Sequence, residues 1–261
     1  MALRILLLGG TQEARLLAEQ LLGKPDVDIT FSLSGALGDN AEAAFRSRMP
    51  HLVGPKTKIR VGGFGGVKGL AQYISENSVD LIIDATHPFA QSMSQNAVSA
   101  SALCNCPIVR FERQPWNAQT CDRWIHVEGL EAAAHCLPQG ARAFLSVGKQ
   151  SVSSFANRSN CWFLVRSIAP IDTTCFSSPV HCLNSLPETN VAAEVALMKQ
   201  FDIDCLVTKN SGAIQAYGKI AAARQMGIKV IVIDRPSLAP CPVFHVLEEL
   251  ELWLDDKLQR L

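Results

Sequence analysis

The chain has 261 residues, and its 24 lysines and arginines balance 24 aspartates and glutamates. Hydrophobic residues make up 48% and charged residues 18%, a globular composition that excludes a disordered chain. The zero net charge excludes the overall positive field that attracts nucleic acid or a membrane surface, and no apolar run approaches the roughly 20 residues of a membrane span.

The first apolar run follows Arg4 and is too short for a signal peptide, so we expect a cytoplasmic protein. The nine cysteines are odd in number, form no CxxC pair, and have no metal-ligand spacing with the six histidines. We therefore expect reduced thiols that pack as small hydrophobic groups, and no metal site.

Short apolar runs alternate with segments of helical period in the first half of the chain, a pattern typical of parallel β/α units. The expected strands cover residues 3–8, 27–33, 59–62, 79–84 and 106–111. The expected helices cover residues 12–22, 38–47, 67–77 and 90–104.

A polar stretch over residues 112–120 contains a proline and has no period, which indicates a domain linker. Beyond it we expect strands at residues 123–127, 142–147, 161–167, 204–208 and 229–234, and helices at 129–136, 150–157, 190–200, 213–226 and 247–260. The sequence thus predicts an α/β protein in which two Rossmann-like parallel-sheet domains face each other across a cleft. Residues 1–115 would form the dinucleotide-binding domain, and residues 120–261 would contribute the substrate cleft.

Ligands of such sheets bind beyond the carboxyl ends of the strands. The first strand runs into Gly9, Gly10 and Thr11 and then into a helix, where free N–H groups suit a phosphate. Arg15 opposes the helix dipole in the first turn, which indicates an anion nearby. A plain strand–helix turn and a surface salt bridge are the alternatives.

The second strand ends at Ser34 without the carboxylate that an NAD site usually places there, which favours NADP. After the third strand, Gly62, Gly63, Gly65 and Gly66 indicate close approach of backbone to a flat or phosphorylated ligand. A tight bend without a ligand is the alternative.

Asp84, Thr86 and His87 follow the fourth strand, and His87 titrates near neutrality and can donate a proton. A hydrogen-bonded loop histidine is the alternative. The matching loop of the second half is Lys209–Gly212. Basic residues at or near strand ends would line a cleft for a polyanion, or else lie scattered on a solvated face: Arg110, Arg113, Lys149, Arg166 and Lys209.

Six motifs occur in the order ILLLGGTQEAR, VGGFGG, DATHPFA, IVRFERQPW, LVTKNSGA and AAARQMGIKVIVIDRP. Together they resemble the precorrin-6A reductase family of cobalamin biosynthesis, including its cobalt-precorrin-6A branch. The resemblance implies two Rossmann-like domains that use a reduced nicotinamide cofactor to reduce one carbon–carbon double bond of a corrinoid (tetrapyrrole) precursor.

On this basis we expect NADPH as cofactor, with NADH as the alternative. The cofactor-binding candidates are Gly9, Gly10, Thr11, Arg15, Ser34, Gly62, Gly63, Gly65, Gly66 and Thr86. The substrate-binding candidates are Phe64, Arg110, Arg113, Lys149, Asn210, Ser211 and Gly212. His87 is the first candidate for the proton donor and Lys209 the second, with water as the alternative.

Two other functions remain open from the sequence. One is an NAD(P)-dependent reductase of another small acid, and the other is a non-enzymatic module that senses NADP. Both a monomer and a small homo-oligomer fit the sequence, as do a metal-free and a cobalt-containing substrate.

Overall fold

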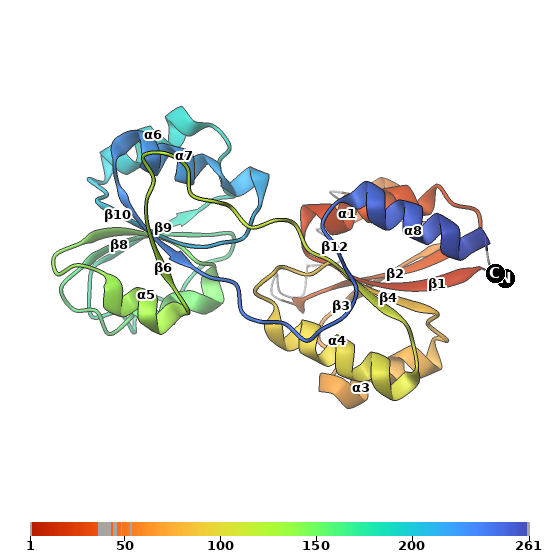
Figure 1. Cartoon of the computed structure of the whole chain (residues 1–261). Helices are drawn as coiled ribbons and strands as arrows, with labels where there is room; N and C mark the ends of the chain where they lie inside the picture. Colours follow the sequence, from red (N-terminus) through yellow and green to blue (C-terminus); the bar gives the residue numbers. More distant parts are fainter. Residues whose placement is uncertain (1, 36–42, 44–45, 48, 53, 260–261) are drawn as a thin grey trace. The chain divides into compact units, whose positions relative to one another are not determined.

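The chain folds into two compact units, each an α/β layer structure around one parallel sheet (Figure 1). The computed structural model describes residues 2–35, 43, 46–47, 49–52 and 54–259. Unit 1 comprises Met1–Gln114 with Ser237–Leu261, and unit 2 comprises Pro115–Pro236. The predicted α/β class with two parallel sheets is confirmed.

The sheet of unit 1 has six strands: β1 (Leu3–Leu8), β2 (Val27–Leu33), β3 (Thr57–Val61), β4 (Leu81–Asp84), β5 (Ile108–Phe111) and β12 (Val243–Phe244). Its helices are α1 (Gln12–Leu22), α3 (Gly66–Glu76), α4 (Gln91–Cys104) and α8 (Leu247–Gln259), with a 3₁₀ turn, η2, at Pro50–Leu52. The strand order is β12-β5-β4-β1-β2-β3, and every pair is parallel. With β12 as the sixth strand, this is the 3-2-1-4-5-6 order of a doubly wound dinucleotide-binding sheet.

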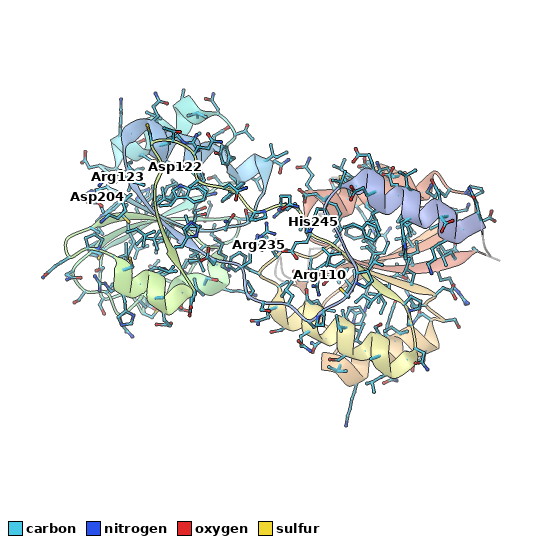
Figure 2. The ribbon with its side chains drawn as sticks, viewed as in Figure 1. Arg110, Asp122, Arg123, Asp204, Arg235 and His245 are labelled. Atoms are coloured by element: carbon cyan, nitrogen blue, oxygen red, sulfur yellow. The ribbon has the colours of Figure 1, made fainter. Side chains whose placement is uncertain are left out.

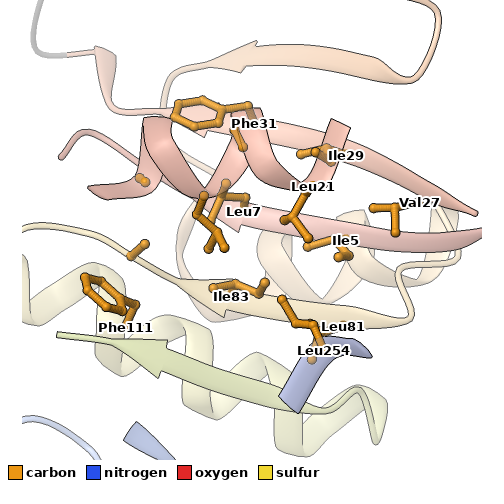
Figure 3. Packing of buried hydrophobic residues seen from close by; sticks show 14 of the residues in the cluster. Ile5, Leu7, Leu21, Val27, Ile29, Phe31, Leu81, Ile83, Phe111 and Leu254 are labelled. Carbon is orange, nitrogen blue, oxygen red and sulfur yellow. The ribbon is translucent and has the colours of Figure 1, made fainter. Parts of the chain in front are cut away.

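Apolar side chains cover both faces of this sheet, which explains why β1 reads as an almost continuous apolar run. On one face, Leu21 of α1 and Leu254 of α8 pack in one cluster with Leu7 of β1 (Figure 3). On the other face, α3 and α4 pack against Leu6 and Leu8. The sheet is therefore fixed between two helical layers, and its carboxyl edge is left for ligands.

The C-terminal segment differs from the expected domain division. We predicted that residues 120–261 form the second domain, whereas residues 237–261 belong to unit 1. There β12 pairs with β5, and Leu250 and Leu254 of α8 are fully buried in the core that α1 covers. The apolar face of α8 decides this placement, because it completes a core built by residues between positions 3 and 111.

Unit 2 has the strands β6 (Arg123–Val127), β7 (Arg142–Ser146), β8 (Trp162–Ser167), β9 (Val180–Asn184), β10 (Cys205–Lys209) and β11 (Lys229–Ile233). Its helices are α5 (Leu130–Cys136), α6 (Val191–Gln200) and α7 (Gly218–Met226), with 3₁₀ segments η3 (Lys149–Phe155) and η4 (Ile214–Ala216). The order is β6-β11-β10-β7-β8-β9, again all parallel. Counted from β7, this is the same 3-2-1-4-5-6 order, but its sixth strand, β6, comes first in the chain.

Several predicted elements differ in detail. The strand β9 was not predicted, the helix expected at 150–157 is the 3₁₀ segment η3, and the helix expected at 213–226 is divided into η4 and α7. A Cβ on Gly218, the first residue of α7, would lie 2.3 Å from the Glu188 carbonyl oxygen, so only glycine fits there. The helix expected at 38–47 lies mostly outside the described residues.

All nine cysteines are unpaired, and Cys106, Cys161 and Cys205 are buried. Burial raises the pKa of Cys106 to about 11 and that of Cys205 to about 12, so both stay protonated as small hydrophobic groups. Cys121, Cys175 and Cys182 are exposed, which the apolar context in the sequence did not predict for them. In the part of the chain that the structure describes, no helix is both long and apolar enough to cross a bilayer.

Candidate functional site

Strands β1 and β4 of unit 1 are neighbours whose following helices lie on opposite faces of the sheet. Such a topological switch point opens a crevice at the carboxyl ends of the two strands, and ligands of doubly wound sheets bind there. Here the crevice is bordered by Gly9–Thr11 after β1 and by Ala85–His87 after β4. Residues that the sequence predicted for cofactor binding and catalysis therefore lie at the expected edge.

The two glycines after β1 serve different purposes. A Cβ on Gly9 would lie 2.5 Å from the ring of Phe31, so Gly9 is required by core packing. Gly10 has φ +125°, and nothing lies within 4 Å of where its Cβ would be. Thr11 caps α1, because its Oγ1 accepts from the Ala14 amide (3.1 Å) and donates to the Ala85 carbonyl (2.9 Å). Gly10 thus leaves open backbone beside a helix N-terminus, which suits a phosphate.

A carboxylate also lies in the first turn of α1. Glu13 would repel a phosphate there, but Arg113 Nη1 lies 2.7 Å from its Oε2 and neutralises it. Arg113 was predicted to bind substrate; in the structure it pairs with Glu13, and its contact with substrate stays a prediction. A hollow of about 10 Å³, roughly the space of one water, lies between Arg113, Thr11 and Thr86. Arg15 is half-buried, and its side chain has no hydrogen bond or ion pair with a described residue.

The glycine loop between β3 and α3 is held by a residue that the sequence did not single out. Arg60 donates from Nη1 to the Gly62 carbonyl (2.6 Å) and from Nη2 to the Gly63 carbonyl (2.8 Å). Its guanidinium carbon lies 3.6 Å from the centroid of the Phe64 ring. Burial lowers the pKa of Arg60, although the group keeps its charge at neutral pH. The exposed Ser34 directly follows β2, the strand beside β3.

The positive φ values of the loop explain its composition. Gly62, Gly65 and Gly66 have φ of +106°, +82° and +79°, which side chains rarely adopt. A Cβ on Gly69 would lie 1.8 Å from the Phe64 carbonyl oxygen, so the loop packs directly onto α3. Gly63 has open space around it. The loop is therefore a fixed backbone surface at the carboxyl edge of unit 1.

Asp84 organises the end of β4 from the interior. Its Oδ1 accepts from the Thr86 amide (3.2 Å) and hydroxyl (2.7 Å), and its Oδ2 accepts from Arg110 Nε (3.1 Å). Arg110 is 5% exposed and also donates to the Ala239 carbonyl (3.2 Å), while its Nη2 has no hydrogen-bond partner among the described residues. Arg110, which was predicted as a substrate residue and is labelled in Figure 2, is thus buried and supports the β4 loop.

His87 is exposed at the tip of the same loop. The Phe89 amide donates to its Nδ1 (3.2 Å), so the neutral ring carries its proton on Nε2. The next turn starts at once, since the Ala90 amide donates to the His87 carbonyl (2.7 Å). This backbone geometry fixes the imidazole at the carboxyl edge of the sheet.

Unit 2 has its own switch point between the neighbouring strands β7 and β10. After β7, Gly148 has φ +83° and Lys149 is exposed at the start of η3. At the end of β10, Lys209 donates from Nζ to Ser151 Oγ of η3 (2.7 Å), and burial lowers the pKa of Lys209. The two predicted lysines of unit 2 therefore belong to one carboxyl edge.

The Asn210–Ser211 segment forms hydrogen bonds within unit 2. Asn210 Oδ1 accepts from the Trp116 amide (2.8 Å), and Nδ2 donates to the Trp116 carbonyl (3.0 Å). Arg235, which the sequence did not single out, donates from Nε to the Asn210 carbonyl (3.0 Å) and from Nη2 to the Ser211 carbonyl (3.2 Å). Gly212, the next residue, has a φ of +72°. Both polar ends of the Asn210 amide thus contact the backbone of Trp116.

A charged cluster lies beneath this edge. Arg166 donates to both carboxylate oxygens of Glu194 (2.5 and 3.2 Å), and both side chains are nearly fully buried. Lys219 is 3% exposed, donates to the Ala216 carbonyl (2.6 Å), and lies 5.0 Å from the centroid of the Trp116 ring. Burial lowers the pKa of Lys219 to about 7, against the opposing effect of Glu194.

The five predicted cations therefore differ in what they offer a ligand. Arg110, Arg113 and Arg166 each face a carboxylate within unit 1 or unit 2. Lys149 is exposed, and Lys209 contacts a neutral hydroxyl. The sequence shows where these charges lie along the chain, but the partner of each is visible only in the fold.

Residues 4–255 of the chain match the family described as precorrin-6x reductase CbiJ/CobK. The chain is 42% identical to a precorrin-6A reductase of Rhodococcus erythropolis over 91% of both chains, and 38% identical to one of Rhodobacter capsulatus over 97% of this chain and 96% of the relative. A cobalt-precorrin-6A reductase of Priestia megaterium is 29% identical over 94% of this chain and 96% of the relative. A solved structure of a CobK precorrin-6A reductase matches with TM-score 0.85 and 37% identity over 98% of this chain and 97% of that one.

Proposed function

Because the chain belongs to the precorrin-6x reductase CbiJ/CobK family, we propose that it reduces precorrin-6A in cobalamin biosynthesis with NADPH as the hydride donor. The observation that carries the proposal is that the similarity spans both units and both switch points, rather than a nucleotide-binding domain alone.

The carboxyl edge of unit 1 fits a nicotinamide dinucleotide. Gly10 leaves open backbone at the N-terminus of α1, and the Glu13 carboxylate beside it is neutralised by Arg113. Ser34 at the end of β2 offers a hydroxyl in place of a carboxylate, which favours NADPH over NADH. When bound, NADPH supplies the hydride. Arg15 is proposed to pair with a cofactor phosphate, since no described residue of the protein neutralises it.

The substrate is proposed to bind through its carboxylates. A corrinoid precursor is a large ring that bears many such groups, and cations at the carboxyl edge of unit 2 would pair with them. Lys149 is exposed at this edge, and the Lys209 ammonium lies beside it, where it donates to the Ser151 hydroxyl of η3. Because the more similar relatives described above are precorrin-6A reductases, we favour the metal-free ring over its cobalt form.

The reduction adds a hydride to one carbon of a double bond and a proton to its neighbour, so one acid is needed for each turnover. His87 is our proposed donor, because its loop is fixed by Asp84 and by the Phe89 amide, and that amide contacts Nδ1, so the protonated ring would give up its proton from Nε2 and return to neutral imidazole. Lys209 is the alternative, since burial lowers its pKa and so makes the ammonium a stronger acid.

The test is an anaerobic assay in which the corrinoid spectrum and the nicotinamide absorbance are followed together. We expect one NADPH to be consumed for each precorrin-6A reduced, and little or no consumption with cobalt-precorrin-6A or with small ketones and imines. Oxidation of NADPH only with small ketones or imines would overturn the proposed substrate. Tight binding of NADP without turnover of either corrinoid would point to a sensing module instead.

A further inference from the structure

The loop after β10 anchors both ends of unit 2. Unit 2 begins at Pro115 and ends at Pro236, so the chain enters and leaves it next to a proline. Trp116 is one residue inside the entry, and its backbone amide and carbonyl both bond to the Asn210 side chain. Arg235, which Figure 2 labels, is one residue inside the exit. Its guanidinium donates to the carbonyls of Asn210 and Ser211. Two positions 119 residues apart in the chain, 116 and 235, thus meet at one pair of residues.

The bonds at the entry are well protected from water. Asn210 is 5% and Trp116 9% exposed, and the Trp116 ring packs edge-on against Tyr217 with centroids 5.9 Å apart. The Asn210 amide copies the donor and acceptor of a neighbouring strand, so both backbone groups of Trp116 are satisfied. Loss of that side chain would leave a buried amide and carbonyl without partners.

The bonds at the exit depend on the shape of a guanidinium. Nε and Nη2 of Arg235 reach two successive carbonyls at 3.0 and 3.2 Å, which a single ammonium cannot do. Pro236 restricts the backbone of Arg235 to extended conformations, and Pro115 fixes its own φ at the entry. Each connection is therefore stiffened by a proline and then bonded to the same loop.

We propose that Asn210 and Arg235 are positioning residues that hold the Lys209–Gly212 loop and both connections of unit 2 as one rigid block. In the proposed function, on which this inference rests, that loop carries Lys209, and the block would keep the loop in its substrate-binding shape. Neither Asn210 nor Arg235 needs to touch the substrate for this role.

Arg235→Lys is the variant that tests the block. It keeps the positive charge but removes the pair of N–H donors that reach the Asn210 and Ser211 carbonyls. Arg123→Lys is the matched control, since Arg123 also donates to a backbone carbonyl of unit 2, that of Gly227 (2.9 Å), but lies at the start of β6 and so at the amino edge of the sheet. Amide hydrogen exchange of the free proteins needs no substrate. We expect exchange at least about tenfold faster in Arg235→Lys both at Asn210–Gly212 and at Trp116, which Arg235 reaches only through Asn210.

Kinetics provide the second measurement. We expect the KM for precorrin-6A to rise about tenfold in Arg235→Lys, with kcat and the Kd for NADPH within about twofold of the wild type. Asn210→Asp keeps the acceptor for the Trp116 amide and removes the donor to its carbonyl, and we expect it to raise the same KM. Addition of free guanidinium to Arg235→Ala should restore part of the loss.

The outcomes separate this inference from the function that it rests on. Unchanged exchange at Trp116 in Arg235→Lys would overturn the block, as would an equal effect of Arg123→Lys. A parallel loss of kcat, cofactor affinity and thermal stability would indicate general destabilisation and would also overturn it. A wild-type protein that does not reduce precorrin-6A would overturn the proposed function alone, since the exchange result would still decide whether the block exists.

Discussion

Arg110 and Asp84 form an ion pair in which the two side chains are only 6% and 1% exposed. The same carboxylate accepts hydrogen bonds from the amide and hydroxyl of Thr86, one residue before His87. A residue on β5 thus sets the shape of the loop after β4. Because the pair is removed from water, its two charges depend on each other far more than a surface pair would.

Replacement of Asp84 by Asn should lower the free energy of unfolding by about 3–5 kcal/mol, because it leaves the Arg110 charge buried without a counter-charge. Urea unfolding of the purified protein measures this. Asp80→Asn is the control, since Asp80 pairs with Arg4 at the surface, where the side chains are 39% and 48% exposed. That loss should stay below about 1 kcal/mol. Equal losses in the two variants would contradict the buried role of Asp84.

Replacement of Arg15 by Ala should weaken NADPH binding by about 1–2 kcal/mol, roughly a tenfold rise in Kd, if its guanidinium meets a cofactor phosphate. Fluorescence titration or calorimetry with NADPH measures the effect. Arg4→Ala removes an arginine from the amino end of β1, at the opposite edge of the same sheet, and should leave the Kd unchanged. An unchanged Kd in Arg15→Ala would remove Arg15 from the cofactor site.

The stability of the protein should depend on the titration of Lys219. Burial lowers the pKa of this lysine from 10.5 to about 7, so between these values the unfolded chain binds one more proton than the folded protein. The free energy of unfolding therefore rises with pH across that window, by up to about 1.4 kcal/mol per pH unit, and this contribution is constant below it, where both states are protonated. Urea unfolding at about pH 7.5 and about pH 9 should show the rise in the wild type.

Lys219→Met should lack this rise, because methionine fills the same space without a titrating group. The comparison isolates Lys219, since every other titrating group is present in both proteins. Parallel pH profiles of the two proteins would mean that Lys219 keeps its ordinary pKa in the fold.

Replacement of His87 by Ala should lower kcat by about a hundredfold while the Kd for NADPH changes little, if the imidazole supplies the proton. Single-turnover spectra of precorrin-6A reduction separate this step from product release. His135→Ala is a suitable control, because His135 is an exposed histidine on α5 of unit 2 whose Nδ1 bonds to the Glu131 carbonyl of its own helix. Full turnover in His87→Ala with a loss in Lys209→Ala would transfer the role to Lys209, and full turnover in both would leave water as the donor.

Much of the fold could be predicted because its strands are buried on both faces. The bounds of β1, β2 and α1 agree with the sequence prediction, since apolar runs or a regular apolar stripe mark them directly. The strand β9 carries exposed or half-buried residues at the sheet edge, and β12 has only two residues, so neither produces an apolar run. Local pattern therefore predicts the buried central strands well, whereas the edge strands vary: β6 has its predicted bounds, and β9 and β12 were missed.

The site was harder to predict, because a residue's chemistry does not reveal its partner. Arg113 meets Glu13 from 100 positions away, and Asn210 meets Trp116 from 94 positions away. Such partners depend on the order of strands in the sheet, which periodicity does not contain. The cations and the amide in the sequence indicated polar loop ends correctly, but only the fold shows that several of them stabilise the loops themselves.

Unit 1 is built from two separate stretches of the chain, with unit 2 between them, and this affects how the protein folds during synthesis on the ribosome. Unit 2 is one continuous stretch that is complete once Pro236 has been made, whereas the first sheet still lacks the β12 strand and the α8 helix that covers Leu7 and Leu21. The nascent chain would then carry a finished second domain beside a first one whose apolar face is partly uncovered. Vectorial synthesis thus reverses the order in which the two domains mature, and the domain made first is the last to become stable.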